Sequence, residues 1–322
     1  MLLRHLGRTG LKVSRLGLGT LTWGSDTDAD DAEEQLRAFV QAGGTLLDTA
    51  ASYGAGASES VIGSLLDSVV DRDDIVLATK AGITRTREER VVDVSRGALL
   101  RSLDVSLERL GVDNVDLWQI HLWSDDVPLE ETLSALDMAV SSGRASYVGI
   151  SNYSGWQTAQ AATYQLSTAG RARLASTQVE YSLLQRGVER EVAPACEALG
   201  LGMLPWSPLG RGVLTGKYRT GIPADSRAAS PVFERYVAEH LTPAAAQVVE
   251  AVCRAAEGLD LSPAAVALAW VRDQPGVTAP IVGARTAAQL KMSLQVEKVT
   301  LPDEIVEALD DVSAPSMGYP EI

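Results

Sequence analysis

The strict alternation of strand-like and helix-like segments is the feature that most constrains how this chain can fold. Short apolar segments recur along the sequence, and each is followed by a segment whose apolar residues have helical spacing. Such alternation predicts a parallel sheet, because each helix returns the chain to the edge at which the next strand begins. The predicted strands are residues 15–20, 45–50, 74–80, 115–121, 146–151, 174–182, 202–209 and 278–284.

The segments between these strands carry residues typical of helix boundaries. The segment 94–111 is the clearest, with leucines at helical spacing and Gly111 as its stop. The segment 262–273 fits a helix, and an irregular loop stays open there as an alternative. The predicted helices are residues 28–44, 58–70, 94–111, 128–143, 155–170, 189–200, 242–258, 262–274, 286–295 and 303–313.

Eight strand–helix repeats favour an α/β fold closed into a (β/α)8 TIM barrel over an open, doubly wound sheet. Residues 2–14 predict a small β-hairpin, turning at residues 8–10, that plugs the floor of the barrel. Extra helices follow near the C-terminus. A length of 322 residues suggests two domains by itself, but barrels of this size fold as one. No linker divides the sequence, so we expect one barrel domain over residues 1–322.

The composition excludes several classes of function. There are 28 basic and 42 acidic residues, and the net charge of −14 argues against a nucleic-acid partner or an anionic membrane surface. Neither Cys196 nor Cys253 lies in a metal-ligand spacing, and we expect both to be reduced and partly buried. No secretory signal core and no run of about 18 apolar residues occurs. We therefore expect a cytoplasmic protein without a metal site.

Reactive side chains follow three consecutive predicted strands. Asp48 ends the second strand, with Tyr53 five residues beyond it, Lys80 ends the third strand and His121 ends the fourth. In a barrel of this kind the active site lies at the carboxyl ends of the strands. Neighbouring strands are about 4.8 Å apart, so these four side chains would share one small mouth.

This set of residue types has a chemical logic. A nearby lysine ammonium lowers the pKa of a tyrosine, an aspartate holds the lysine in place, and an imidazole orients a substrate carbonyl. Together they form a proton donor aimed at a carbonyl group. Each residue alone also has a structural interpretation, His121 as a hydrogen-bonded core histidine for instance. The other two histidines, His5 and His240, are predicted to lie at the surface.

The segments "GTLLDTAASYG", "VLATKAG" and "DLWQIH" resemble the catalytic segments of the aldo-keto reductases, in the branch of the potassium-channel β subunits. The similarity extends from "LGRTGLKVSRLGLGT" to "IVGARTAAQL", which is nearly the whole chain. The resemblance implies that Tyr53 is the general acid, Lys80 tunes its pKa, Asp48 pairs with Lys80, and His121 orients the carbonyl.

The cofactor-binding residues are read mainly from the same resemblance, since "GLGTLTWG" is not a G-x-G-x-x-G motif. The resemblance implies NADPH, with Trp206 stacked on the nicotinamide, and the guanidinium of Arg285 suits a 2′-phosphate. Many members carry a Glu–Asn pair where this chain has Met292 and Ser293, which departs from the family pattern. The implied cofactor-binding residues are Gly19, Thr20, Leu21, Asp48, Ser151, Asn152, Gln178, Trp206, Ser207, Leu209, Gly210, Gly212, Lys217, Gly283, Arg285, Gln289 and Ser293.

Several of these residues have structural alternatives. The polar side chains at 151, 152 and 178 could cap helices, the segment 209–216 could be a plain flexible loop, and Arg285 could be an exposed arginine. On the substrate side, an aromatic wall of Trp23, Tyr53, His121 and Trp123 suits aldehydes and ketones in general. Such a wall does not distinguish a sugar from a steroid or an aromatic aldehyde.

Three functions compete at this stage. The first is an NADPH-dependent oxidoreductase that reduces a small carbonyl substrate to an alcohol, with Tyr53 as the proton donor. The second is a catalytically weak, NADPH-binding sensor or regulatory subunit, as the potassium-channel β subunits are. The third, weaker one is an isomerase or aldolase with Lys80 as a Schiff base, which leaves Trp206 and Arg285 unexplained. A homo-oligomer is compatible with any of them.

Overall fold

A computed structural model describes residues 1–85, 90–224, 226–230, 233–315 and 318. Its main sheet has eight parallel strands in the order β11-β10-β9-β8-β5-β4-β3-β12. The two end strands approach each other, because the amide of Met203 donates to Gly276 and the amide of Thr278 donates to Met203. The strands are β3 (Gly17–Gly19), β4 (Leu46–Asp48), β5 (Val76–Ala81), β8 (Val115–Ile120), β9 (Ala145–Ser151), β10 (Leu174–Glu180), β11 (Gly202–Trp206) and β12 (Ile281–Gly283).

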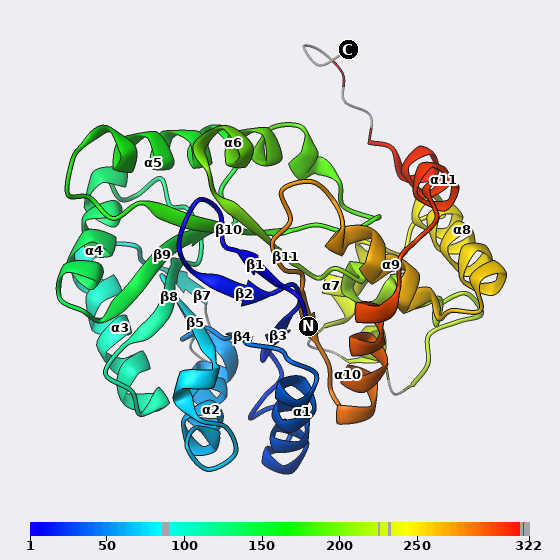
Figure 1. Cartoon of the computed structure of the whole chain (residues 1–322), viewed down its shortest axis with the longest axis horizontal. Helices are drawn as coiled ribbons and strands as arrows, with labels where there is room; N and C mark the ends of the chain where they lie inside the picture. Colours follow the sequence, from blue (N-terminus) through cyan, green and yellow to red (C-terminus); the bar gives the residue numbers. More distant parts are fainter. Residues whose placement is uncertain (86–89, 225, 231–232, 316–317, 319–322) are drawn as a thin grey trace.

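Helices surround this sheet on its outer side (Figure 1), so the predicted (β/α)8 TIM barrel is confirmed. Residues 263–272 form a helix that begins after the Ser262 cap, so the loop alternative for this region is wrong. The helices are α1 (Ala29–Gln41), α2 (Ala57–Leu65), α3 (Arg96–Leu110), α4 (Leu129–Ser141), α5 (Gly155–Ser167), α6 (Val192–Leu199), α7 (Glu234–Ala238), α8 (Pro243–Leu259), α9 (Pro263–Arg272), α10 (Ala287–Leu294) and α11 (Asp303–Ser313).

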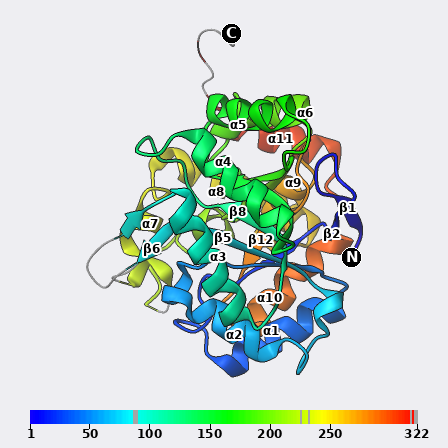
Figure 2. The same cartoon turned by 90° about the vertical axis from the view of Figure 1, so that its left-hand side faces the viewer.

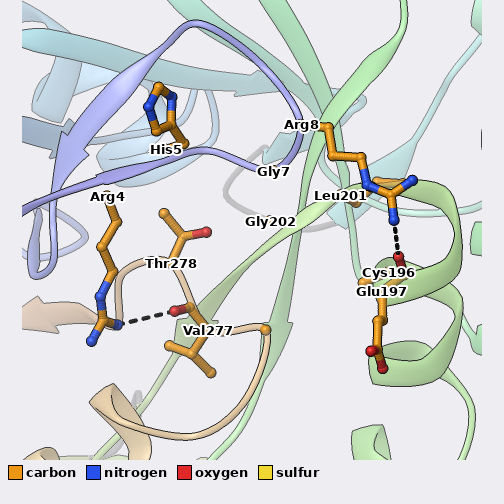
Figure 3. A pocket seen from close by; sticks show the side chains of 12 residues that line it. Arg4, His5, Gly7, Arg8, Cys196, Glu197, Leu201, Gly202, Val277 and Thr278 are labelled. Atoms are coloured by element: carbon orange, nitrogen blue, oxygen red, sulfur yellow. Dashed lines mark hydrogen bonds between the residues drawn. The ribbon is translucent and has the colours of Figure 1, made fainter.

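The predicted N-terminal hairpin is present and lies across one end of the barrel. Strands β1 (Leu3–His5) and β2 (Lys12–Ser14) pair antiparallel, and Leu6 beside them is fully buried. Figure 3 shows how the hairpin is attached: Arg4 donates to the carbonyl of Val277, and Arg8 donates to the carbonyl of Glu197. These bonds join the hairpin to helix α6 and to the segment before β12, so it closes the floor.

Elements that the sequence analysis did not predict lie at the opposite end. Strands β6 (Ile83–Arg85) and β7 (Arg90–Val92) form a second hairpin, and helix α7 is a short helix after β11. Figure 2 shows β6 and α7 at the end of the barrel away from β1 and β2. The carboxyl ends of the barrel strands open at this end, where a barrel site is expected.

The barrel interior is layered because alternate residues of a strand face the same side. The layer nearest the plug is apolar and includes Leu6, Leu46, Leu117 and Leu204. Two residues further along their strands, Asp48 and other polar groups take the inward positions. Apolar side chains between the strands and helices form the larger core, which includes both cysteines, and both are buried and free. No helix among the described residues is long and apolar enough to cross a membrane.

We predict that Leu6→Ala lowers the free energy of unfolding by about 2 to 5 kcal/mol, since it leaves a cavity under the barrel interior. Leu3→Ala in the same hairpin is the control, because Leu3 is 53% exposed. Urea denaturation followed by circular dichroism measures both. Equal effects of the two substitutions would show that the hairpin does not seal the floor.

Candidate active site

The four residues that sequence analysis grouped lie together at the mouth of the barrel, around the ammonium group of Lys80. The Lys80 Nζ donates to Asp48 Oδ2 at 2.7 Å and to the Thr49 carbonyl at 2.8 Å, and it lies 3.5 Å from Tyr53 Oη. The ring of Tyr53 meets the ring of His121 edge-on, with centroids 5.9 Å apart. The lysine therefore joins the acid to the phenol, and the phenol adjoins the imidazole.

Asp48 is held from both sides. Its second oxygen, Oδ1, accepts from Gln178 Nε2 at 2.8 Å, and its own carbonyl accepts from both the amide and the hydroxyl of Thr20. The Asp48 and Lys80 side chains are 2% and 0% exposed, so they form a buried ion pair. Such pairs are retained only where hydrogen bonds satisfy both charges, as they do here.

The environment keeps Lys80 protonated. Burial by itself would lower the pKa of the Lys80 ammonium, but the Asp48 carboxylate and the Tyr53 phenol outweigh it, and the pKa of Lys80 is raised. A positive charge is therefore fixed 3.5 Å from the Tyr53 oxygen at neutral pH. Tyr53 is only half-buried, so part of its side chain is accessible from the open mouth. The arrangement can stabilise a phenolate and can move a proton at Tyr53 Oη.

The polar residues at the ends of β9 and β10 are largely engaged in bonds within the protein. Ser151 Oγ donates to the carbonyl of Gln178, and Asn152 Nδ2 donates to the carbonyl of His121. Asn152 Oδ1 accepts from the indole N–H of Trp206 at 3.0 Å. Asn152 thus connects the strand that carries His121 to the aromatic ring at the end of β11.

The loop after β11 begins in a backbone conformation that glycine favours. Gly210 and Gly212 have φ angles of 54° and 92°, in the left-handed region that side chains rarely adopt. Leu209 and Ser207 precede them, and Ser207 Oγ lies 2.9 Å from Tyr236 Oη. Lys217 is exposed a few residues later. The loop thus presents backbone groups toward solvent, together with the Lys217 ammonium, which lies 5.1 Å from the ring centroid of Tyr218.

The residues after β12 surround the start of helix α10. The amide of Arg285 donates to Gln289 Oε1, and Ser293 Oγ donates to the carbonyl of Gln289 one turn later. Gly283 is exposed, and Ser293 is buried. Sequence analysis missed Arg227, which is half-buried and whose guanidinium lies 5.8 Å from the ring centroid of Phe233. Burial and the nearby guanidinium of Arg285 lower the pKa of Arg227.

The Arg227 guanidinium, desolvated by burial and near that of Arg285, fits a bound phosphate, and the polar side chains at the ends of β9 and β10 fit a carboxamide. The residues present are therefore compatible with a phosphorylated dinucleotide. Arg227 could not be assigned from its sequence, "DSRAAS", because nothing in that spacing places it beside Arg285. Among the described residues, no group of three His, Cys, Asp or Glu side chains could hold a metal ion.

The predicted aromatic wall is only partly assembled. Trp23 is fully buried, and its indole N–H lies 3.3 Å from Gln35 Oε1, so it belongs to the core and is not available at an open surface. Leu21, by contrast, is 38% exposed. Trp123 packs edge-on against Tyr153 and Trp156, which sequence analysis did not include. Its indole N–H donates to Asp125, which fixes the ring on the loop after β8.

Comparison with known proteins agrees with this geometry. The sequence model of the Aldo/keto reductase family matches residues 15–314. The chain belongs to the aldo/keto reductase family. It is 37% identical to the "Uncharacterized oxidoreductase YrpG" of Bacillus subtilis (strain 168), covering 96% of this chain and 94% of that one. The resemblance stated from the sequence is therefore confirmed.

Other relatives have different names. The chain is 34% identical to a "Probable voltage-gated potassium channel subunit beta" of Oryza sativa subsp. japonica, over 96% of this chain and 95% of that one. It is also 34% identical to an "L-glyceraldehyde 3-phosphate reductase" of Escherichia coli O157:H7, over 95% of this chain and 91% of that one. The family match and these relatives show that this aldo/keto reductase is an oxidoreductase.

We predict that Lys80→Met lowers the free energy of unfolding of this aldo/keto reductase at neutral pH by about 3 to 5 kcal/mol, since Asp48 would be left as an unpaired buried charge. The pKa of Lys80 is raised on folding, so its contribution is fully present below the unfolded value of about 10.4 and is lost as pH rises through the folded value. The stability difference between the two proteins should therefore be flat around neutral pH and shrink only in strong alkali.

Lys291→Met is the control, because Lys291 pairs with Glu34 at the surface and its loss should change stability by less than about 1 kcal/mol. Denaturant titrations over a range of pH measure the three proteins. A difference that already shrinks near neutral pH would contradict a raised pKa.

Proposed function

We propose that this chain is an NADPH-dependent reductase that converts an aldehyde or ketone to an alcohol, with Tyr53 as the proton donor. The observation that carries the proposal is the position of the Lys80 ammonium, bonded to buried Asp48 and 3.5 Å from Tyr53 Oη. A carbonyl oxygen that gains charge needs a proton, and a phenol beside a fixed cation can supply it. The bound nicotinamide supplies the hydride.

Each residue has one task in this proposal. Lys80 favours the ionised form of Tyr53, which makes the phenol a stronger acid, and Asp48 keeps the ammonium in place. His121 lies edge-on to Tyr53 and orients the substrate carbonyl toward it by a hydrogen bond. Trp123, together with Tyr53 and His121, lines the substrate side. We propose that the substrate is a small carbonyl compound that binds against these side chains.

For the cofactor we propose two groups of contacts. Ser151, Asn152 and Gln178 face the carboxamide, and Trp206, whose ring Asn152 orients, stacks on the nicotinamide. The backbone of the loop after β11 and its Lys217 ammonium face the pyrophosphate. Gly19 and Leu21 contact the cofactor from the opposite side. The proposed contacts of that loop are Ser207, Leu209, Gly210, Gly212 and Lys217, and those after β12 are Gly283, Arg285, Gln289 and Ser293.

The pair Arg227 and Arg285 supports NADPH over NADH, since a 2′-phosphate can bind two guanidiniums that lie near each other. We predict that Arg227→Ala and Arg285→Ala each raise the Kd for NADPH roughly tenfold and leave the Kd for NADH unchanged. Arg254→Ala is the control, because its guanidinium is exposed on α8 and pairs with Glu250. Fluorescence titration measures both cofactors. Equal weakening of NADH binding would refute a 2′-phosphate contact.

We predict that Tyr53→Phe lowers kcat by at least about 100-fold with an activated aromatic aldehyde, because it removes the proposed proton donor. The Kd for NADPH should stay within about twofold, since the phenol is not needed to bind the dinucleotide. Oxidation of NADPH measured by absorbance gives the rate. Tyr164→Phe is the control, since Tyr164 lies on α5 beside Arg171. Equal turnover in both variants would mean that another group donates the proton.

A second function is favoured by the relatives named as voltage-gated potassium channel subunit beta. In that case the chain is an NADPH-binding regulatory subunit with weak catalysis, and a homo-oligomer in the cytoplasm suits either function. A stable oligomer that holds NADPH tightly and shows negligible turnover would establish it. The Schiff-base alternative has little support, because the Lys80 side chain is fully buried and its ammonium is a poor nucleophile.

A further inference from the structure

Two buried polar side chains in the first turn of α2 anchor this helix to the strands that carry the tetrad. Ser58 and Glu59 are both fully buried. Ser58 Oγ lies 2.9 Å from Thr49 Oγ1 and 2.8 Å from Thr20 Oγ1. The Thr20 hydroxyl in turn donates to the carbonyl of Asp48. The start of α2 is therefore bonded to the residue that follows Asp48 and, through Thr20, to Asp48 itself.

Glu59 forms the second anchor of this helix. Its Oε1 accepts from the hydroxyl of Thr79 at 2.7 Å, and its Oε2 accepts from Arg109 Nη1 at 3.2 Å. Thr79 directly precedes Lys80 on β5, and Arg109 lies in the last turn of α3. A carboxylate without exposed surface is stable only where its charge is paired and hydrogen-bonded. Glu59 therefore connects the start of α2 to β5 and to α3 at once.

Tyr53 lies in the turn between β4 and α2, and the backbone of this turn is strained. Gly54, Ala55 and Gly56 have φ angles of 56°, 54° and 99°, so three consecutive residues adopt the left-handed region. Ala55 carries a side chain, which makes this conformation costly. Strained backbone of this kind persists only where the surrounding structure imposes it. The two anchors of α2 impose it at the end of the turn that β4 does not hold.

The guanidinium of Arg109 lies directly against this turn. A Cβ atom placed on Gly56 would overlap the guanidinium carbon of Arg109, so the close approach needs glycine as much as the φ angle does. Two turns further along α2, a Cβ atom on Gly63 would overlap the carbonyl oxygen of Arg109. Helix α2 and the turn before it are therefore packed against the end of α3, and the Arg109 side chain supports the turn that carries Tyr53.

We propose that Glu59 and Arg109 are positioning residues that hold the turn of Tyr53 in place for proton transfer. The inference rests on the proposed role of Tyr53 as proton donor. The distance of 3.5 Å between Lys80 Nζ and Tyr53 Oη joins two parts that are held separately. Lys80 is fixed by β5 and by its bond to Asp48, whereas Tyr53 depends on the turn before α2. Without the Glu59–Arg109 pair the turn relaxes, and the phenol spends less time beside the ammonium.

The test compares Arg109→Met with Arg72→Met. Arg72 makes a partly buried pair with Asp116 at 2.8 Å, and Asp116 lies near the start of β8, at the floor end of the barrel. With NADPH and an activated aromatic aldehyde, kcat should fall about tenfold in Arg109→Met and stay within about twofold in Arg72→Met. The Kd for NADPH should stay unchanged in both, because neither arginine is a proposed cofactor contact. Arg109→Lys keeps a cation beside Glu59, so it should fold and show a smaller loss of kcat.

A second measurement needs neither cofactor nor turnover. In protein whose tyrosines carry ¹³C at Cζ, the NMR signal that is missing from Tyr53→Phe reports the titration of this phenol. The groups that face it are Lys80 on β5, Asp48 on β4 and His121 after β8. In Arg109→Met the midpoint of the Tyr53 titration should move to higher pH, since the phenol is then less often beside the ammonium that favours its ionised form.

The same midpoint should stay in place in Arg72→Met. An unchanged kcat or an unchanged midpoint in Arg109→Met would each overturn the proposal. Absence of turnover in the native chain would refute the proposed reductase instead, and the titration of Tyr53 would still decide whether Arg109 holds the turn.

Discussion

A buried charge at the mouth of an apolar barrel is the constraint on which the rest of the site depends. The Lys80 ammonium lies directly above a layer of apolar side chains, and it is stable there only because Asp48 and the Thr49 carbonyl accept its hydrogen bonds. Asp48 in turn needs Gln178 and Thr20 to satisfy its other oxygens. The neighbouring strands therefore have to keep their register for the charges to remain paired, and the register places Tyr53 beside the lysine.

The fold and the tetrad could be predicted because both depend on short-range pattern. Eight strand–helix repeats favour a barrel over an open sheet, and the barrel places the last residue of every strand at one edge. Asp48, Lys80 and His121 could be grouped from their positions at the ends of consecutive strands alone, without a prediction of how the loops fold. The eight strands were found for the same reason, and errors at their boundaries do not change which residues lie at the mouth.

The residues that sequence analysis missed or misplaced depend on long-range contacts. His240 was assigned to the surface because its local sequence has no periodicity, yet it is buried by a carboxylate 60 residues away on β10. Trp23 follows a strand, as an active-site residue would, but the chain turns it toward Gln35 on α1. Arg211 and Arg227 lie in a stretch of turns and short helices after β11, and only the folded segment gives them neighbours.

The residues that could be predicted and those that were missed lie mainly in two different parts of the molecule. The tetrad is held by the barrel strands and by the turn that follows β4, while buried apolar side chains and the Arg211–Glu180 ion pair attach the segment after β11. The chain carries a net charge of −14, which disfavours the approach of a phosphorylated dinucleotide. Arg227 and Arg285 place two positive charges near each other on an acidic protein. An anion that binds there is attracted by this local charge against the long-range field of the protein.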